Sequence, residues 1–534
     1  MSDNKSPFQE GIEEDAVLEQ FGYQQELKRH FSLLGMVGFS FSIVTSWTAL
    51  GGVLIIGVES GGPPVMIWSW VGVSILSLAV GCSLAEMCSK FPLAGGQYSW
   101  VAILAPKSVA KVMSYICGWF MLIGILAMGA VNNFVGANFI LGLAALFNEG
   151  YVIERWHTVL LTWLICIFAG SVNLFATRLL DKISKFILVW NISSFVIVVI
   201  TILTMQKDKQ PASFVFTEFH NSTGFNPAFA AIIGVVQALF GLVCYDAPSK
   251  MTEELMEPRR QAPHAIIWSV CIGAFTGFIF LVSLCFCMGD IEATANSVTG
   301  SPLIQIFYDS TGSKAGAGGL TSLIVVIVVF CANSLLAEGS RAVWAFSRDR
   351  GLPFSGVFSR VSSTSKIPVN AILLTMVVQA AFNAIYFGNL TGFETVITIS
   401  TEGFYVSYAL PMIARLLSVV LHGTPEVIFD GPFRLPRALS IFLNVAALVY
   451  VLFGVITFNL PTVSPVDADN MNYTPAAIGA IMLIAGVNWF WLQRGKREGF
   501  RGPDEGRVMS VIEGSALEPS QVVASDSATE HKTK

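Results

Sequence analysis

The sequence predicts an all-α integral membrane protein with twelve transmembrane helices. Hydrophobic residues make up 54% of its 534 residues and charged residues only 13%, whereas a soluble domain carries about 25% charged residues. A membrane-spanning helix needs about 20 mostly apolar residues, and the chain contains twelve such runs. The formal net charge of -5 and the lack of a basic run interleaved with aromatic residues argue against a nucleic-acid partner. The lipid bilayer is the expected surrounding, and a soluble enzyme is disfavoured.

The twelve apolar runs follow one another between two polar ends. Residues 1–30 are polar and acidic without a signal-peptide pattern, so we expect a cytosolic N-terminal segment. The twelve-helix domain occupies 31–495, and residues 496–534 are expected to form a disordered cytosolic tail. In chain order the expected spans are 33–58, 65–87, 112–147, 157–177, 185–205, 228–247, 265–288, 318–344, 368–387, 391–415, 439–460 and 474–493.

The placement of lysine and arginine gives the orientation. With the N-terminus inside, 27 of the 31 Lys and Arg residues fall in segments that face the cytosol, and 4 fall in outer loops. Positive residues favour the cytoplasmic side of a membrane, and an even number of spans returns the chain to its starting side. Both termini are therefore expected in the cytosol.

Cysteine and histidine give no sign of a disulfide, metal or cofactor site. All nine Cys residues lie inside the apolar runs or at their ends, without a CxxC pair, and the six His residues show no ligand spacing. We therefore expect no metal and no cofactor. In the outer loop before the sixth run, Asn221-Ser222-Thr223 forms a candidate glycosylation sequon.

Few ionisable residues interrupt the runs, and those that do are informative because a charge inside a bilayer is costly. Asp246 lies near the end of the sixth run and Glu402 near the middle of the tenth. Glu338 and Arg341, three residues apart in the eighth run, are expected to neutralise each other on one helical face. Asp246 can pair with Lys250 one turn later, whereas Glu402 has no basic neighbour and needs a wet cavity, a partner or a cation.

The first and sixth runs are composed so that a helix can break. Residues 35–52 and 234–248 mix Gly, β-branched and hydroxyl side chains, and Gly costs a helix about 1 kcal/mol relative to Ala. A break exposes backbone groups that must face a cavity. Secondary transporters bind solutes where corresponding helices of two inverted halves break. The spacing of five runs fits inverted repeats at about 33–205 and 228–415, with two further helices at 439–493.

Four stretches carry a more specific signal, and the resemblance that they indicate covers about residues 20–500. They are Phe39–Leu50, then Ala85–Met87 with Phe91–Trp100, then Tyr245–Pro248 with Met251–Glu254 and Pro258, and finally Ser340–Arg341 with Trp344–Asp349 and Leu352–Phe354. They include the patterns Pro-x-x-Gly-Gly-x-Tyr and Ser-Arg-x-x-Trp-Ala. Through these patterns the sequence resembles the amino acid–polyamine–organocation superfamily, and within it the fungal amino acid/choline permeases, which include choline and GABA carriers.

This resemblance implies a LeuT-like fold, in which helices one to five and six to ten form a five-plus-five inverted repeat with two extra helices. It implies a solute held between broken helices one and six, and transport that is mostly proton-driven. The substrate-binding residues it implies are Ser42, Thr45, Ser46 and Trp47 in the first helix and Phe240, Tyr245 and Asp246 in the sixth, with Phe240 as a candidate aromatic gate. The cytoplasmic gate it implies contains Glu253, Glu254, Glu338, Arg341 and Arg348.

Two features depart from the family. Some relatives place a titratable lysine in the fifth helix, yet Phe186 to Met205 contains no Lys, His, Asp or Glu. Glu402 stands where a neutral residue is expected, so it is a candidate for coupling or for holding a cationic substrate.

Together these observations predict an alternating-access carrier, not an enzyme. Its expected cargo is a small amine or amino-acid-like solute such as choline, GABA or an amino acid, with the proton as coupling ion. Asp246 and Glu402 would match a positive charge, and aromatic faces on the broken helices attract ammonium groups. An exporter of an amine alkaloid and a non-transporting nutrient sensor are the alternatives. The plasma membrane is the expected location, with the vacuole as the alternative.

Overall fold

The computed structural model describes residues 7–148, 150–289, 294, 299–388, 390–422, 430–468, 470–494 and 499–503. These residues are almost entirely helical, and two short strands, β1 (Ser60–Gly61) and β2 (His220–Asn221), pair antiparallel. Within the described ranges, eleven helices are long and apolar enough to cross a membrane, and the shorter apolar helix α11 (Pro227–Gly241) takes the place of the sixth expected span. The predicted all-α membrane fold is confirmed. The predicted tail at 496–534 lies outside the described residues except for 499–503.

Ten of the expected spans each correspond to one long helix. Some helices start well before the apolar run, as α13 does at Pro258 instead of residue 265, because polar residues extend the helix beyond the hydrocarbon layer. The ten helices are α5 (Gly62–Lys90), α7 (Lys107–Phe147), α8 (Arg155–Phe175), α9 (Leu180–Met205), α13 (Pro258–Cys287), α16 (Lys314–Arg348), α18 (Val369–Ala384), α19 (Leu390–His422), α20 (Arg437–Phe458) and α21 (Thr474–Arg494).

The first expected span is divided into consecutive pieces. Residues 33–58 form α2 (Leu33–Val44), α3 (Ser46–Gly52) and most of α4 (Leu54–Glu59). The Ser32 side chain caps the start of α2 by accepting a hydrogen bond from the backbone N–H of Gly35. The sixth span is divided as well, since α11 is followed by the four-residue helix α12 (Ala247–Lys250) and the 3₁₀ turn η2 (Thr252–Glu254).

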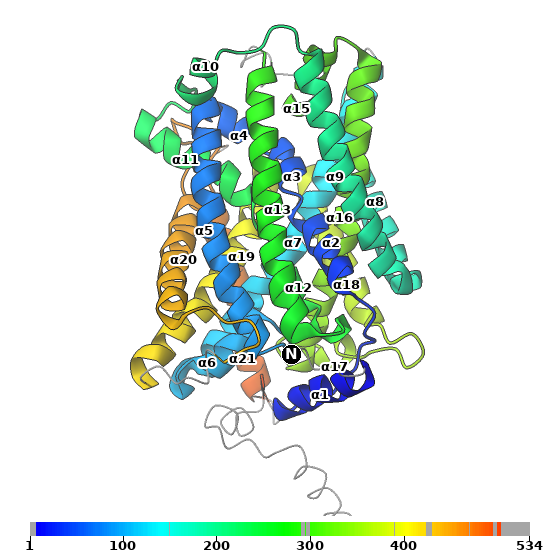
Figure 1. Ribbon diagram of the computed structural model, residues 1–534, viewed down its shortest axis with the longest axis vertical. Helices are drawn as coiled ribbons and strands as arrows, with labels where there is room; N and C mark the ends of the chain where they lie inside the picture. Colours follow the sequence, from blue (N-terminus) through cyan, green and yellow to red (C-terminus); the bar gives the residue numbers. More distant parts are fainter. Residues whose placement is uncertain are drawn as a thin grey trace, which may run out of the picture.

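Short helices gather at the two ends of the helical bundle. At the lower end in Figure 1 lie α1 (Pro7–Gln20), α6 (Gln97–Leu104) and α17 (Ser355–Phe358), and at the upper end lie α10 (Ala212–Phe216) and α15 (Pro302–Thr311). The predicted orientation assigns the end with α1 to the cytosol, and we refer to it as the inner end. Two 3₁₀ turns, η1 (Thr177–Leu179) and η3 (Ile385–Phe387), connect long helices.

Helices in equivalent positions of the two halves pack on one another, as an inverted repeat requires. The second span α5 contacts the seventh, α13; the third, α7, contacts the eighth, α16; and the fourth, α8, contacts the ninth, α18. Helices α7 and α19 also approach closely because both carry glycine at their crossing. A Cβ atom on Gly403 would lie 2.7 Å from Cα of Gly124. Small residues of this kind let membrane helices bring their backbones together.

Candidate functional site

The break between α2 and α3 in the first span falls at one residue, Thr45. Its backbone angles, φ 18° and ψ 46°, lie outside the helical region, so α2 ends at Val44 and α3 starts at Ser46. The carbonyl oxygen of Thr45 accepts hydrogen bonds from the backbone N–H groups of Thr48 and Ala49, at 2.9 and 3.0 Å. The break therefore falls within residues 35–52, whose composition favours a helix break, and among the residues that the resemblance implied for the first helix.

The sixth span has a longer interruption. Residues 242–246 lie between α11 and α12 and belong to no helix. Cys244 in this stretch has φ 66°, a left-handed conformation that is uncommon for a residue other than glycine. Backbone groups released from a helix inside a membrane must find partners or face a cavity, and both interruptions border the same cavity.

The cavity between the two interruptions has a volume of about 40 Å³. Thr45 and Thr48 line it from the first span, Val243 and Cys244 from the sixth, and Asn132 from α7. Its remaining lining residues are mostly apolar: Ile43, Val44, Ala49, Met128, Val131, Val135, Phe240, Val328, Cys331 and Leu335. A pocket for a small molecule usually measures about 300 Å³ or more. The helices are therefore closed around a space that a solute can enter only when they move.

Of the residues that the resemblance implied in the first span, only Thr45 lines the cavity. Ser42 hydrogen-bonds the hydroxyl group of Ser334 on α16, at 2.7 Å, and is fully buried. The hydroxyl oxygen of buried Ser46 has no hydrogen-bond partner among the described residues.

Trp47 also lies away from the cavity. Its indole N–H donates to Oδ1 of Asn191 on α9, at 2.7 Å, and its ring contacts Phe195 and Phe280 edge to face. These contacts position α3 against α9 and α13. Trp47 is therefore a packing residue in this conformation.

In the sixth span, Phe240 lines the cavity, whereas Tyr245 and Asp246 are not among its lining residues. Tyr245 stacks on Tyr408 of α19, with ring centroids 5.4 Å apart. Asp246 forms a buried ion pair with Lys250, so the expected local pair is present. Asp246 also accepts hydrogen bonds from Tyr408 and from the amide of Gln97, at 2.5 and 2.6 Å.

Glu338 and Arg341 do not neutralise each other, and that expectation was wrong. Oε1 of Glu338 lies 2.8 Å from Nζ of Lys250, and Nε of Arg341 lies 2.6 Å from Oε1 of Glu254. Both partners belong to the segment that follows the sixth-span interruption. This segment presents opposite charges to α16, and each α16 side chain pairs across the interface instead of along its own helix.

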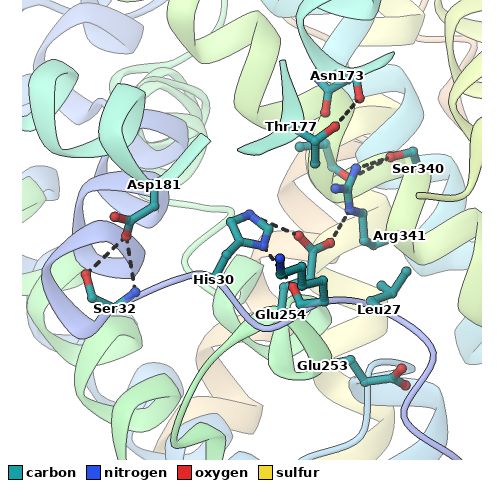
Figure 2. Close-up of polar contacts among 12 residues, drawn as sticks. Leu27, His30, Ser32, Asn173, Thr177, Asp181, Glu253, Glu254, Ser340 and Arg341 are labelled. Carbon is teal, nitrogen blue, oxygen red and sulfur yellow. Dashed lines mark hydrogen bonds and ion pairs between the residues drawn. The ribbon is translucent and has the colours of Figure 1, made fainter. Parts of the chain in front are cut away.

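The N-terminal segment covers this interface at the inner end. In Figure 2, the Glu254 carboxylate lies between Arg341 and His30, whose Nε2 is 3.5 Å from Oε2 of Glu254, and Glu253 points away from them. The backbone N–H groups of His30 and Phe31 both donate to the carbonyl oxygen of Glu254, at 2.9 and 3.0 Å. Phe31 and Leu255 form a parallel β-bridge.

Glu253 pairs with Arg348 at the end of α16, where NH1 of Arg348 lies 2.8 Å from Oε1 of Glu253. The Arg348 guanidinium also stacks over the rings of Tyr23 and Trp344, with its central carbon 4.3 and 4.4 Å from their centroids. Four of the five residues that the resemblance implied for a cytoplasmic gate, Glu253, Glu254, Arg341 and Arg348, thus form two acid–base pairs between the same two elements.

Asp349, which follows α16, joins three further segments at the inner end. The hydroxyl groups of Tyr23 and Tyr98 donate to its carboxylate at 2.9 and 2.8 Å. Burial raises the pKa of the Asp349 carboxyl, although Arg348 and the two tyrosine hydroxyls oppose that shift. The carbonyl oxygen of Asp349 accepts a hydrogen bond from the N–H of Arg501.

Phe500, next to Arg501, is buried at this inner end. Its ring packs against the rings of Tyr98, Tyr115 and Phe346, with centroids between 5.5 and 6.3 Å apart. The segment 499–503 thus closes over the end of the bundle. An open cleft of about 810 Å³ lies between this segment and the N-terminal segment.

Glu402 lies apart from the cavity and from the charged groups of the inner end. Its side chain is 4% exposed, and Oε1 accepts a hydrogen bond from Nδ2 of Asn459, at the end of α20. Oε2 has no hydrogen-bond partner among the described residues. Of the three surroundings predicted for Glu402, the structure provides a polar partner.

The sequon residue Asn221 belongs to β2. Its Nδ2 donates to the carbonyl oxygen of Phe225, and its Oδ1 accepts from the hydroxyl of Thr223. Glycosylation at Asn221 stays a prediction.

Sequence reasoning found Lys250 as a partner of Asp246 but missed the other residues around this pair. Lys250 was recognised as a local partner but not as a bridge to Glu338, 88 positions away. Gln97 directly follows the glycine pair of the Pro-x-x-Gly-Gly-x-Tyr pattern, which offered a signal for its role. Tyr408 carried no signal in the sequence.

Comparisons with known proteins are consistent with this arrangement. The chain matches the family model described as amino acid permease over residues 31–484. It is 63% identical over 442 residues to a putative amino acid/polyamine transporter of Macrophomina phaseolina, covering 83% of this chain and 97% of that protein.

Two more distant relatives match over a similar extent. The choline transporter of Saccharomyces cerevisiae is 31% identical over 474 residues, which cover 88% of this chain and 82% of that protein. The amino-acid permease BAT1 homolog of Oryza sativa subsp. japonica is 31% identical over 503 residues, which cover 91% of this chain and 95% of that protein. The chain therefore belongs to the amino acid permease family, whose members are membrane transporters and not enzymes.

Proposed function

We propose that this permease carries a small amine or amino-acid-like solute, such as choline, GABA or an amino acid, by alternating access through the cavity between Thr45 and Cys244. The observation that carries the proposal is that both helix interruptions border one enclosed space in the bundle. Interrupted helices that meet at a cavity are the binding device of secondary transporters. The proposal places both termini in the cytosol and the protein in the plasma membrane, with the vacuole as the alternative.

The chemistry of the cavity lining supports a small solute with one apolar part. Among the residues that line it, only the cysteines are titratable. A positively charged group would therefore be matched by backbone carbonyls at the interruptions and by the Phe240 ring, since aromatic faces attract ammonium groups by about 0.5–2 kcal/mol. Asp246 is engaged with Lys250, so its earlier assignment as a direct partner of the substrate is not part of this proposal.

The contacts at the inner end support the assignment of this structure to a state that is closed on that side. Two ion pairs, Glu254–Arg341 and Glu253–Arg348, join the segment after the sixth-span interruption to α16, and the N-terminal segment covers them. In the proposed cycle these contacts separate to release the solute to the cytosol. Separation of this kind, around a fixed central site, is how inverted-repeat transporters alternate access.

Uptake into proteoliposomes tests the proposal. Labelled choline, GABA and lysine are the probes, and the wild-type chain is compared with Val328→Phe, which fills the cavity with a ring. The matched control is Val449→Phe on α20, where Val449 is 64% exposed on the outside of the bundle. We expect Val328→Phe to abolish uptake of the transported probe and Val449→Phe to leave it unchanged.

Gel filtration of both purified variants shows whether each one folds. Thr45→Ala provides a milder change at the cavity, and we expect it to raise the KM for the transported probe. Unchanged uptake in both Val328→Phe and Thr45→Ala would place the transport route elsewhere.

A further inference from the structure

Lys250 is a fully buried cation placed between two buried carboxylates. It forms ion pairs with Asp246 and with Glu338, and the side chains of all three residues are completely inaccessible to solvent. The Nζ atom also lies 5.3 Å from the centroid of the Phe404 ring. Two carboxylates and one ammonium leave an excess negative charge in a site closed to solvent, and such a charge is costly unless a proton neutralises it.

The hydrogen bonds indicate which carboxylate takes the proton. Asp246 accepts from three groups: the ammonium of Lys250, the hydroxyl of Tyr408 and the amide of Gln97. Glu338 accepts only from Lys250, through Oε1, and its buried Oε2 has no hydrogen-bond partner among the described residues. Donors stabilise the ionised form of a carboxylate, so Asp246 is favoured as the anion and Glu338 as the neutral acid.

The other titratable groups near this triad do not supply the missing positive charge. They are thiols or phenols, which are neutral near pH 7. They are Cys117 on α7, Cys244 and Tyr245 in the sixth-span interruption, Cys331 on α16 and Tyr408 on α19. Arg341, one turn along α16 from Glu338, is bonded to Glu254.

We propose that the Lys250-bridged pair Asp246 and Glu338 is a proton-binding site of this permease, with Oε2 of Glu338 as the atom that holds the proton. The proposal rests on the transport function proposed above and names the group that couples transport to protons. It assigns the site to the contact between the sixth and eighth spans, whereas the fifth span lacks a titratable residue from Phe186 to Met205.

The position of Lys250 links this proton to opening of the inner end. Lys250 and Asp246 lie on the same short segment, whereas Glu338 is on α16, so a movement that separates the two elements leaves Asp246 paired and Glu338 alone. An ionised Glu338 resists that separation because it would remain as an unpaired buried charge. Protonated Glu338 lacks this attraction, so proton binding favours opening and proton release favours closure.

Infrared difference spectroscopy of the purified full chain at acidic and alkaline pH tests proton binding without a substrate. A buried protonated carboxyl group gives a carbonyl band that disappears on deprotonation. We expect Glu338→Gln to lack one such band, and we expect the control Asp309→Asn, at an exposed carboxylate on α15, to keep it. Glu402→Gln is expected to remove a different band. A Glu338→Gln spectrum identical to that of the wild type would overturn the proposal.

Asp246→Asn gives a second test, because a merely structural role of Asp246 would leave the Glu338 carbonyl band unchanged. It leaves one carboxylate for one ammonium, so the intact Glu338 becomes ionised and its band is lost. Retention of the Glu338 band in Asp246→Asn would contradict the charge argument. This test also serves if Glu338→Gln fails to fold.

Transport in proteoliposomes tests coupling, with labelled choline, GABA and lysine as probes and the membrane potential clamped at zero. An inward proton gradient of one pH unit supports about tenfold accumulation when one proton accompanies each solute. We expect Glu338→Gln to lose this accumulation while exchange of the same probe continues, and accumulation equal to wild type would overturn the proposal. If the wild type transports none of the probes, the transport function fails for them, and the infrared result still decides the proton site.

Discussion

The guanidinium Nε of Arg341 lies 2.6 Å from Oε1 of Glu254, and both side chains are almost completely buried. This pair joins α16 to the segment that follows the sixth-span interruption. Breaking a buried pair by removing one partner usually costs about 3–5 kcal/mol because the other charge is left uncompensated. The Arg341–Glu254 contact is therefore a strong candidate for holding the inner end closed.

Arg341→Gln is expected to open the inner end more often than in the wild type. Cys244 lines the cavity and is buried, so its thiol reports on access. We expect a small hydrophilic thiol reagent to modify Cys244 faster in Arg341→Gln, as measured by mass spectrometry. The control Arg434→Gln removes an exposed ion pair with Asp430, which is worth at most about 1 kcal/mol. Equal labelling of Cys244 in the two variants would contradict the closing role of Arg341.

Lys250→Met should destabilise the protein by about 3–5 kcal/mol, since it leaves two buried carboxylates without their cation. Adding Glu338→Gln removes one of those carboxylates. Because the two residues are in contact, we expect the double variant to be more stable than the sum of the single effects allows. Thermal unfolding of the four proteins in detergent measures this coupling, and strict additivity would argue against a direct interaction between the two side chains.

Gly403→Ala is expected to destabilise the contact between α7 and α19. The new Cβ atom would lie 2.7 Å from backbone atoms of Gly124, which cannot move aside as a flexible side chain can. Overpacking of this kind costs about 1–3 kcal/mol. Gly72→Ala is the control, because a Cβ atom at Gly72 meets nothing within 4 Å. The unfolding temperature should fall for Gly403→Ala and stay equal or rise for Gly72→Ala.

Phe500→Ala is expected to release the segment 499–503 from the inner end. Phe500 is 2% exposed, and truncating a buried Phe typically costs about 3–5 kcal/mol. Phe354→Ala, at an inner-end residue that is 80% exposed, is the control. We expect faster proteolytic cleavage near Arg501 in Phe500→Ala only. The same cleavage rate in both variants would show that the aromatic contacts do not hold the segment.

Hydropathy predicted the membrane-spanning helices because it reports directly on burial in lipid. Composition likewise indicated that a helix could break within residues 35–52, where Thr45 lies. It did not predict that Trp47 faces α9, since composition does not set the rotation of a helix about its own axis.

The charged groups were harder to predict because their partners lie far apart in the chain. Glu338 and Arg341 have the spacing of an intrahelical pair, yet each bonds to a different helical segment. Tyr408 and Gln97 contact Asp246 only because α19 and α6 meet beside the interrupted sixth span. Such contacts follow from tertiary packing and leave no periodic pattern in the sequence.

The hydrogen bonds from His30 and Phe31 to the Glu254 carbonyl attach the leading segment to the residue that pairs with Arg341 of α16. Deleting the first 32 residues to improve expression would remove both of these backbone N–H donors together with the Phe31 ring. Water would then reach the Glu254 carboxylate from the inner end. A protein shortened in this way is expected to open more often at the inner end. Transport rates measured with it would therefore differ from those of the full chain.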